Sequence, residues 1–360
     1  MLSNRYIFIR AKCGELKMEL MNYDEVLAYL LKNKRSPSLL LGNGFSMAYD
    51  SDIFSYNALQ AFVDKTDDPI LKKIFDIVKT KNFETVMRQL DNFCELAALF
   101  SEDKNLPKEI KKAHVKLKTS LLSAIKEMHP EHVFKISDEE CGTCAKFMKP
   151  YMENGGKIFS TNYDILLYWV LMRSGLDNSD GFGKDRLDDP NDKDSTPIYS
   201  DELYWGRNSQ SIFYLHGALP LFDTGTEIVK EQYNGDFLLH NIEGRMEDGE
   251  YPVFVAAGDG EDKLTHIMHN RYLSACYEAL VGVEGSLVTF GFNFGDYDEH
   301  IIEAINRAAK RKKDKEFREK LLSVYIGVFS EEALDHIESV RHKFKVKINL
   351  YDARTAKVWR

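Results

Sequence analysis

The stretch LLLGNGFSMAYD, residues 39–50, decides the fold, because a run of three leucines ends in Gly42 and Gly44, with Ser46 close behind. Glycines after a hydrophobic strand let the backbone approach an anion, and the next helix directs its N–H groups toward that anion. The pattern predicts a strand, a phosphate-binding turn and a helix, although Gly-x-Gly also occurs in ordinary turns. The rest of the chain has to separate these two interpretations.

The composition limits the class of protein. The chain has 360 residues, of which 44% are hydrophobic, enough for one large domain or two small ones. Its formal net charge of 48 − 57 = −9 disfavours non-specific binding to nucleic acid or to anionic membranes. No apolar segment approaches the roughly 20 residues of a membrane span, and the first residues lack the pattern of a signal peptide. We therefore expect a cytoplasmic protein.

The cysteines indicate no metal site. The five cysteines are scattered, which suits a reducing compartment, and only Cys141 and Cys144 form a CxxC pair. Structural zinc usually needs four ligands, and the sequence has no second cysteine pair. We expect both cysteines to lie within a helix, and we expect no metal cofactor.

Seven short hydrophobic segments are the candidate strands. Several of them lack polar alternation, so both faces of the sheet should be covered, as in a mostly parallel sheet between helical layers. The sequence predicts an α/β fold, a Rossmann-like parallel sheet sandwiched by helices, with a large helical insertion after the first strand. The candidate strands are 38–42, 157–161, 212–216, 252–258, 286–291, 323–328 and 345–351.

The domain organisation follows from the segments between these strands. Residues 1–35 are predicted to be an N-terminal tail and a helix beginning near Tyr23, and 36–360 to be the Rossmann-like domain. Residues 52–150 look almost wholly helical, whereas a βαβ crossover needs only about a dozen residues, so we expect a helical insertion. Residues 175–210 are rich in Asp, Gly, Asn and Ser, which predicts a polar, lid-like insertion that gates a site.

Polar residues follow three of the candidate strands. Ligands of an open parallel sheet bind outside the carboxyl ends of its strands, so these residues should meet at the same edge as the glycine-rich turn. They are Thr161, Asn162 and Asp164 after one strand, His216 after the next, and Gly291, Asn293 and Asp298 after the strand at 286–291.

The order of these motifs resembles the sirtuin-related, SIR2-like NAD-binding family, and it looks closest to the divergent bacterial branch of uncharacterised SIR2-like proteins. The motifs are Gly-x-Gly-x-Ser, Thr-Asn-Tyr-Asp, His-Gly and Phe-Gly-x-x-x-x-Asp, and the resemblance covers roughly residues 36–330. It implies that NAD+ is the substrate. For this branch it implies NAD+ hydrolysis to nicotinamide and ADP-ribose, often in bacterial antiphage defence.

Two other activities fit less well. The dinucleotide fingerprint of dehydrogenases has a third glycine, whereas residues 42–47 read Gly-Asn-Gly-Phe-Ser-Met, and no second strand follows about 20 residues later. Hydride transfer is therefore disfavoured. The chain also lacks the two cysteine pairs of the zinc module of classical sirtuins, which disfavours protein deacylation.

The resemblance assigns catalytic roles to three residues. Asn162 would position water or the ribose hydroxyls, His216 would be the general base, and Asp164 would bind the nicotinamide amide or steady the loop. Each residue also has a structural alternative. Asn162 can cap the following helix, Asp164 can complement the helix N-terminus, and His216 can bond the backbone at a strand end.

The remaining motif residues are candidates for binding NAD. The diphosphate would be cradled by the turn after the first strand, and the adenosine ribose would lie at the opposite side of the crevice. The alternatives are a helix N-cap for Ser46 and a turn with a helix cap near 291–298. The diphosphate candidates are Gly42, Gly44 and Ser46, the pocket-lining candidates are Asn43, Phe45 and Thr161, and the ribose candidates are Gly291, Asn293 and Asp298.

Three functions remain open from the sequence. The first is an NAD+ hydrolase. The second is ADP-ribosyl transfer or deacylation on a protein, and the third is a non-catalytic sensor of NAD nucleotides. Asn162 and His216 favour an enzyme, because a sensor does not need them. A homo-oligomer or a regulatory protein partner is expected to restrain the activity.

Overall fold

The centre of the molecule is a seven-stranded sheet with the strand order β3-β14-β13-β12-β4-β5-β8, and every described pair of neighbouring strands is parallel. This confirms the predicted Rossmann-like α/β fold. The strands are β3 Met21–Asn22, β4 Pro37–Leu41, β5 Ile158–Ser160, β8 Ile212–Tyr214, β12 Gly285–Phe290, β13 Leu321–Val328 and β14 Lys347–Asp352. The computed structural model describes residues 7–10, 16–50, 69–78, 83–128, 135–176, 179–188, 196–233, 238–255, 260–295, 298–310 and 320–360.

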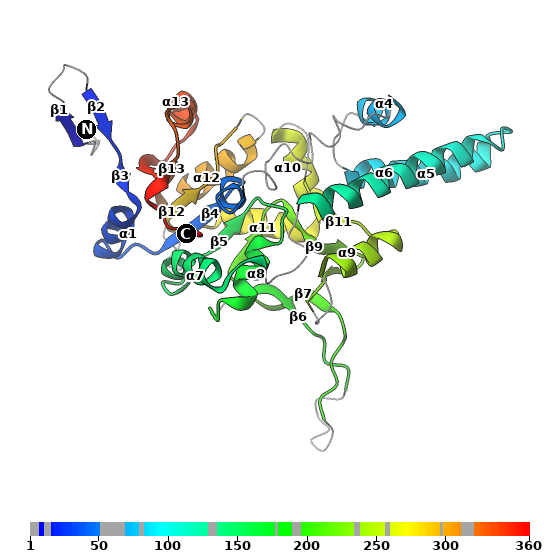
Figure 1. Ribbon diagram of the computed structural model, residues 1–360, viewed down its shortest axis with the longest axis horizontal. Coiled ribbons are helices and arrows are strands. Elements are labelled where there is room, and N and C mark those ends of the chain that lie inside the picture. Colours follow the sequence, from blue (N-terminus) through cyan, green and yellow to red (C-terminus); the bar gives the residue numbers. More distant parts are fainter. Residues whose placement is uncertain are drawn as a thin grey trace.

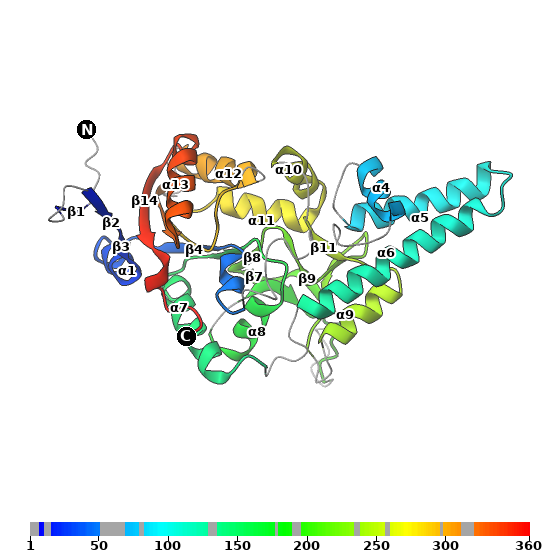
Figure 2. The same ribbon diagram turned by 45° about the horizontal axis from the view of Figure 1, so that its top comes forward.

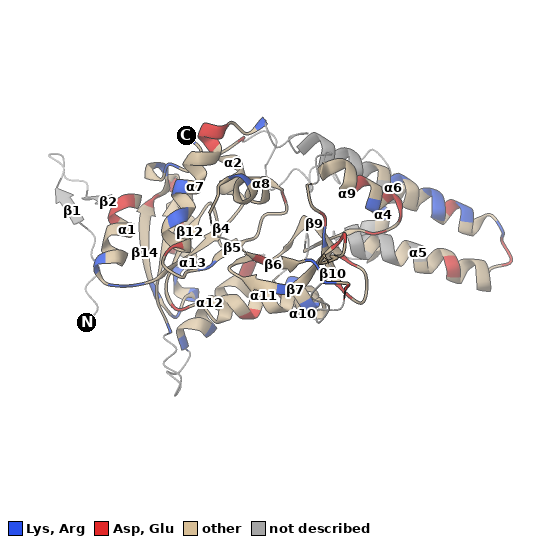
Figure 3. Ribbon diagram, turned by 90° about the horizontal axis from the view of Figure 1, so that it is seen from below, with Lys and Arg blue, Asp and Glu red and all other residues tan. Residues whose placement is uncertain are grey.

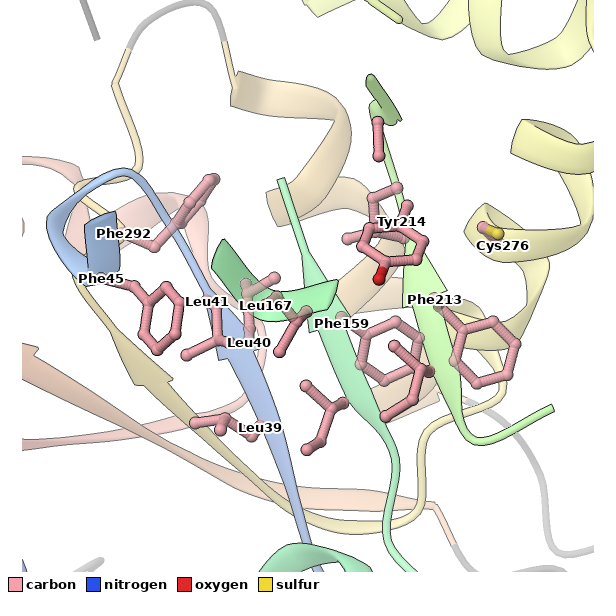
Figure 4. Packing of buried hydrophobic residues seen from close by; sticks show 14 of the residues in the cluster. Leu39, Leu40, Leu41, Phe45, Phe159, Leu167, Phe213, Tyr214, Cys276 and Phe292 are labelled. Carbon is pink, nitrogen blue, oxygen red and sulfur yellow. The ribbon is translucent and has the colours of Figure 1, made fainter. Parts of the chain in front are cut away.

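Strand β4 lies inside this sheet, as the leucine run predicts. Its Leu41 pairs with Phe290 of β12 on one side and with Ser160 of β5 on the other, and all five β4 residues are buried. Figure 4 shows the β4 leucines beside Phe159 of β5 and Phe213 of β8. A strand that is covered on both faces has no place for polar alternation, which explains the sequence pattern.

Helices cover both faces of the parallel sheet (Figures 1 and 2). One layer contains α1, α7 and α8, and the other contains α10, α11, α12 and α13. Helix α1 begins at Tyr23, as predicted, and its first turn carries a capping box formed by Asn22 and Glu25. The helices are α1 Tyr23–Lys32, α7 Asp138–Met152, α8 Leu166–Arg173, α10 Gly260–His269, α11 Arg271–Val281, α12 Glu299–Lys310 and α13 Glu331–Val340, with 3₁₀ turns Arg341–Lys343 and Ala353–Thr355.

The helical insertion is shorter than predicted. Helices α4 Pro69–Val78, α5 Phe83–Phe100 and α6 Leu106–Met128 form it, and α5 and α6 project together from one end of the molecule (Figures 1 and 2). Helix α7 instead covers the sheet, because the ring of Phe147 packs against Phe290 at a centroid distance of 5.5 Å. It is the crossover helix between β4 and β5. Of the predicted range, 52–68, 79–82 and 129–134 lie outside the described residues.

Cys141 and Cys144 lie within α7, as predicted, and both are buried free thiols. A helix that packs on the sheet buries small apolar side chains, and a thiol behaves as one.

A second sheet, which the sequence did not predict, lies beside the first. Its order is β11-β9-β10-β7-β6, all pairs are antiparallel, and α9 Leu238–Glu247 contacts it. The predicted strand at 252–258 belongs here and not to the parallel sheet, so that prediction is wrong. The reason is the turn after β8, where Gly217 has a φ of +81° and starts β9, which then pairs with β11. The strands are β6 Asp180–Gly183, β7 Leu203–Gln210, β9 Gly217–Asp223, β10 Ile228–Lys230 and β11 Pro252–Phe254.

The predicted polar lid at 175–210 is a β-hairpin. Strands β6 and β7 pair with each other, and the adjoining residues 184–188 and 196–202 point away from the parallel sheet (Figure 1). The carbonyl of Ser179 accepts hydrogen bonds from the N–H groups of Ser211 and Ile212, at the amino end of β8. The base of the hairpin therefore lies opposite the edge at which the polar strand-end residues meet, so the predicted position over the site is wrong. Residues 177–178 and 189–195 lie outside the described residues.

The first strands and the charges complete the fold. The predicted N-terminal tail contains an antiparallel pair, β1 Ile7–Arg10 and β2 Leu16–Glu19. Charged residues lie mostly on helices and loops, and β4, β5 and β12 carry none (Figure 3). Within the described ranges, no helix is long and apolar enough to cross a membrane.

Candidate functional site

The candidate site lies at the carboxyl ends of β4, β5 and β8. The single-turn helix α2, Gly44–Met47, follows β4 and carries Ser46. Asn162 and Asp164 follow β5, and His216 follows β8. The strand-end residues thus share one edge of the sheet, as the parallel topology predicts.

Ser46 joins the first two motifs. The side-chain amide of Asn162 donates to Ser46 Oγ at 3.0 Å, and Ser46 Oγ in turn donates to the carboxylate of Asp164. Because a hydroxyl has one proton and gives it to Asp164, it must accept from Asn162, which fixes the orientation of the amide. Ser46 is 0% exposed and Asn162 is 7% exposed, so water does not compete for these bonds. Ser46 is therefore a buried connector and makes no N-cap hydrogen bond.

Asp164 has two functions in the structure. One carboxylate oxygen accepts from Ser46, and the other accepts from the N–H of Leu166 at 3.0 Å, in the first turn of α8. Asp164 therefore accepts a hydrogen bond from the N-terminal turn of α8, which is the helix-capping role that was the structural alternative for Asn162. The side chain of Asn162 is held by Ser46 instead, so the helix-cap alternative for Asn162 is wrong.

His216 is paired with a second histidine. Its Nε2 lies 2.8 Å from Nε2 of His300, which is in the first turn of α12, and the ring of Tyr163 stacks on it at 6.4 Å. Burial, then His300 and then Lys263 lower the pKa of His216 well below its ordinary value. The ring is therefore neutral at physiological pH. Its hydrogen bond to another side chain replaces the backbone bond that was the structural alternative.

Lys263 and Asp298 lie against the two histidines. The Lys263 side chain is 1% exposed, and its Nζ lies 3.2 Å from Asp298 Oδ1. Burial raises the pKa of Asp298, and Lys263 opposes this shift. Burial, followed by the charge of Lys263, lowers the pKa of His300 to about 3. Both histidines therefore stay neutral beside one internal ion pair.

This cluster has the donors of a metal site but already contains a cation. One ring nitrogen of each histidine and one carboxylate oxygen of Asp298 lie within 4.8 Å of one another, and two nitrogens with one oxygen suit a transition metal. A divalent ion about 5 Å from Lys263 would be repelled by roughly 7 kcal/mol at an effective dielectric constant of about 20. Lys263 thus supplies the positive charge that balances Asp298.

The glycines of the first motif hold two strand ends together. The N–H of Gly42 donates to Phe290 at 3.0 Å, and the N–H of Gly44 donates to Gly291 at 2.9 Å. A Cβ on Gly44 would lie 2.6 Å from the Cα of Gly291, which itself has a φ of +67°. The close approach between the ends of β4 and β12 is therefore enough to require glycine at position 44.

The predicted diphosphate cradle needs correction for the same reason. The N–H groups of Phe45 and Ser46 bond to the carbonyls of Gly42 and Asn43, so these donors are used inside the turn, as are those of Gly42 and Gly44. The structure does not present them to an anion.

Two predicted pocket residues have structural tasks. Phe45 is 1% exposed and packs against Trp359 at 5.0 Å, and the Trp359 indole N–H donates to the Phe45 carbonyl at 2.8 Å. Its ring lies in the core, which contradicts a pocket-lining role. The hydroxyl of Thr161 donates to Leu41 at 3.3 Å and ties β5 to β4. Asn43 is half-buried.

The three residues predicted to bind the adenosine ribose have different surroundings in the structure. Gly291 packs against Gly44, the side chain of Asn293 is exposed, and Asp298 lies in the cluster with His216. The expectation that these three residues face the far side of the crevice is therefore wrong for Asp298, which lies beside the candidate base.

Sequence reasoning missed His300 and Lys263. His300 lies with Ile301 and Ala304 on the buried face of α12, and a histidine within an apolar helical stripe is a usable signal. Lys263 gave no signal, because a lysine in a polar segment is usually solvated.

The fold and the site define an α/β protein with a Rossmann-like sheet and a buried polar cluster at the carboxyl edge of its strands. Residues 39–359 match the domain of unknown function DUF4917, and the chain belongs to this family. The matched range encloses the helical insertion and Trp359. No curated protein matches the chain.

Proposed function

We propose that this protein is a divergent SIR2-like NAD+ hydrolase, which cleaves NAD+ to nicotinamide and ADP-ribose. The observation that carries the proposal is the hydrogen-bonded set of Ser46, Asn162 and Asp164, which links the first two of four ordered motifs at the ligand-binding edge of a parallel sheet. His216, from the third motif, follows the next strand of the same sheet.

The proposed reaction needs no general acid, because the leaving group is already cationic. The bond between ribose C1′ and the nicotinamide nitrogen breaks with its electron pair going to the already cationic ring, and the ribose passes through an oxocarbenium-like state. Asn162, with its amide nitrogen bound to Ser46, directs its carbonyl oxygen to water or a ribose hydroxyl. His216, neutral because its pKa is lowered, offers a lone pair to the proton that is released.

The test is a product analysis of purified protein with NAD+. Nicotinamide and ADP-ribose in equal amounts are expected by chromatography and mass spectrometry. Cyclic ADP-ribose, or ADP-ribose attached to protein, would instead show cyclisation or transfer. Binding of NAD+ by calorimetry without release of nicotinamide would indicate a sensor, and absence of both would contradict the proposal.

Two variants locate the chemistry. Asn162→Ala and His216→Ala are expected to lower kcat/KM by about 100-fold or more. The matched controls are Asn154→Ala and His269→Ala, which change exposed residues of the same types and should retain activity. Activity of either site variant equal to that of its control would remove that residue from the mechanism.

A further inference from the structure

The helical insertion carries a large share of the exposed apolar side chains of this protein. Within the described part of the chain, 17 large hydrophobic side chains are exposed, and eight of them lie on α4, α5 and α6. Large exposed apolar patches are uncommon on monomeric proteins and mark interaction sites. Four of the eight lie on α5 and are between 50% and 79% exposed: Phe93, Leu96, Leu99 and Phe100.

Helix α5 has two apolar stripes, and only one of them is buried. Leu90 and Ala97 are buried in the helical hairpin, the unit formed by α5 and α6 packed along each other. Phe93, Leu96 and Phe100 have the i, i+3, i+7 spacing of a second helix face, which the helical hairpin leaves in solvent. A four-helix bundle encloses such faces by turning them inward, which two helices alone do not do.

The charges of the helical hairpin are divided between its two helices. Exposed lysines lie on α6, and exposed acidic residues lie near the end of α5 and in the loop after it (Figure 3). Glu109 is an acid on α6, and it is paired with Lys112 at 2.6 Å. A basic helix beside an acidic one is complementary to a second copy of itself about a twofold axis. The lysines are Lys108, Lys111 and Lys112, and the acids are Glu95, Glu102 and Asp103.

We propose that the helical hairpin is the interface between two copies of this chain, which meet there in a four-helix bundle. In this dimer, α5 of each copy lies against α6 of its partner, so that the exposed stripe is covered and the acids of α5 meet the lysines of α6. The helical hairpin projects from one end of the molecule, so two copies can meet without contact between their parallel sheets (Figures 1 and 2). The inference does not depend on the proposed NAD+ hydrolysis.

The area of the exposed stripe fits a dimer of ordinary size. A large hydrophobic residue has about 200 Å² of surface, so the four exposed residues of α5 present about 450 Å² per copy. Two copies would bury about 900 Å² from these residues, and homodimer interfaces are about 65% apolar. The whole interface would then be about 1,400 Å², within the range of about 1,200–2,000 Å² that stable complexes bury.

The first experiment measures the mass of the purified full chain by sedimentation equilibrium at micromolar concentration. We expect twice the mass of one chain. Leu96→Lys combined with Phe100→Lys should raise the Kd of the dimer at least about 100-fold, because it places charge in the apolar stripe, opposite the lysines of the partner. Both positions are exposed in the single chain, so the variant should fold.

The matched control is Leu31→Lys combined with Phe329→Lys. These residues are 52% and 71% exposed, and they lie outside the helical insertion, so the Kd should stay at the wild-type value. A monomeric wild-type protein would overturn the proposal, because it would leave the stripe to a different partner or to solvent. Equal Kd values for the two double variants would overturn it as well, because the interface would then lie elsewhere.

The second experiment tests the pairing of α5 with α6 by exchanging charges. Glu95→Lys combined with Glu102→Lys makes both helices basic, and Lys108→Glu combined with Lys111→Glu makes both acidic. Each variant alone should dimerise at least about 10-fold more weakly than the wild-type protein, because like charges then face each other. An equal mixture of the two should form a heterodimer with a Kd close to the wild-type value.

Native mass spectrometry distinguishes the heterodimer from the two homodimers by mass. A mixture that contains no more heterodimer than either variant forms homodimer would contradict the pairing of α5 with α6 of the partner. Charge variants that each dimerise as tightly as the wild-type protein would contradict it too.

Discussion

Replacing Ser46 by alanine tests whether the site is held by one buried hydroxyl. The substitution removes two hydrogen bonds, one accepted from Asn162 and one donated to Asp164. Asn162 is 7% exposed, and leaving a buried polar group unpaired costs about 1–3 kcal/mol. Asp164 is half-buried and keeps its bond to Leu166, so water can replace the serine at a cost of about 1 kcal/mol.

The expected loss for Ser46→Ala is therefore about 2–4 kcal/mol in the free energy of unfolding. The assay is equilibrium unfolding in urea, followed by tryptophan fluorescence, with a lower midpoint and an unchanged m-value as the expected signature. NAD+ turnover should fall as well, because the freed amide of Asn162 loses its orientation.

The control is Ser286→Ala, at an equally buried serine of β12. Ser286 makes one hydrogen bond, to Ser323 at 3.0 Å, and Ser323 keeps Arg35 as a donor at 3.2 Å. We expect a loss of about 1 kcal/mol and no change in turnover. If Ser46→Ala is no less stable than Ser286→Ala, the buried network does not hold the site and our reasoning is refuted.

Gly44→Ala should destabilise the protein by about 3 kcal/mol in thermal unfolding, because the new Cβ would lie 2.6 Å from backbone, whereas Gly142→Ala, with open space in α7, should be neutral or stabilising by up to about 1 kcal/mol. Equal effects would contradict the packing role. Trp359→Phe should cost about 1–2 kcal/mol in urea unfolding, because it removes the indole donor to a buried carbonyl, and a smaller loss would show that water replaces it. His216 and His300 stay neutral in the fold, so below pH about 6.5 the unfolded chain binds more protons and stability falls, with each histidine contributing about 1.4 kcal/mol per pH unit. In urea titrations at pH 5 to 7, His300→Phe should reduce this slope by one proton, and an unchanged slope would show that His300 is protonated in the fold.

The parallel sheet could be predicted because each of its strands can be recognised from its own hydrophobic sequence. The β4 run is buried on both faces, so its sequence lacks polar alternation, and the same holds for β12. The second sheet was not predicted because β7, with the sequence LYWGRNSQ, is mostly polar. Pairing with β6 and β10 holds it in the sheet. Such pairing depends on partners distant in sequence, which local patterns do not reveal.

The candidate site was predictable to the same extent. The rule that ligands bind at the carboxyl ends of parallel strands brought Asn162 and His216 to one edge, as the structure has them. It did not give their neighbours, since His300 and Lys263 come from helices whose positions depend on the whole fold. Nor could it separate the two uses of Gly44, because a ligand and a neighbouring backbone both require the absence of a Cβ.

The contact between Trp359 and the Phe45 carbonyl joins positions 314 residues apart. On the ribosome, synthesis proceeds at about 5–20 residues per second, so the support beneath α2 arrives only tens of seconds after the turn itself has emerged. Until then Ser46 has no firm base from which to hold Asn162. The order of synthesis thus delays completion of the site until Trp359 has emerged and can pack beneath the turn.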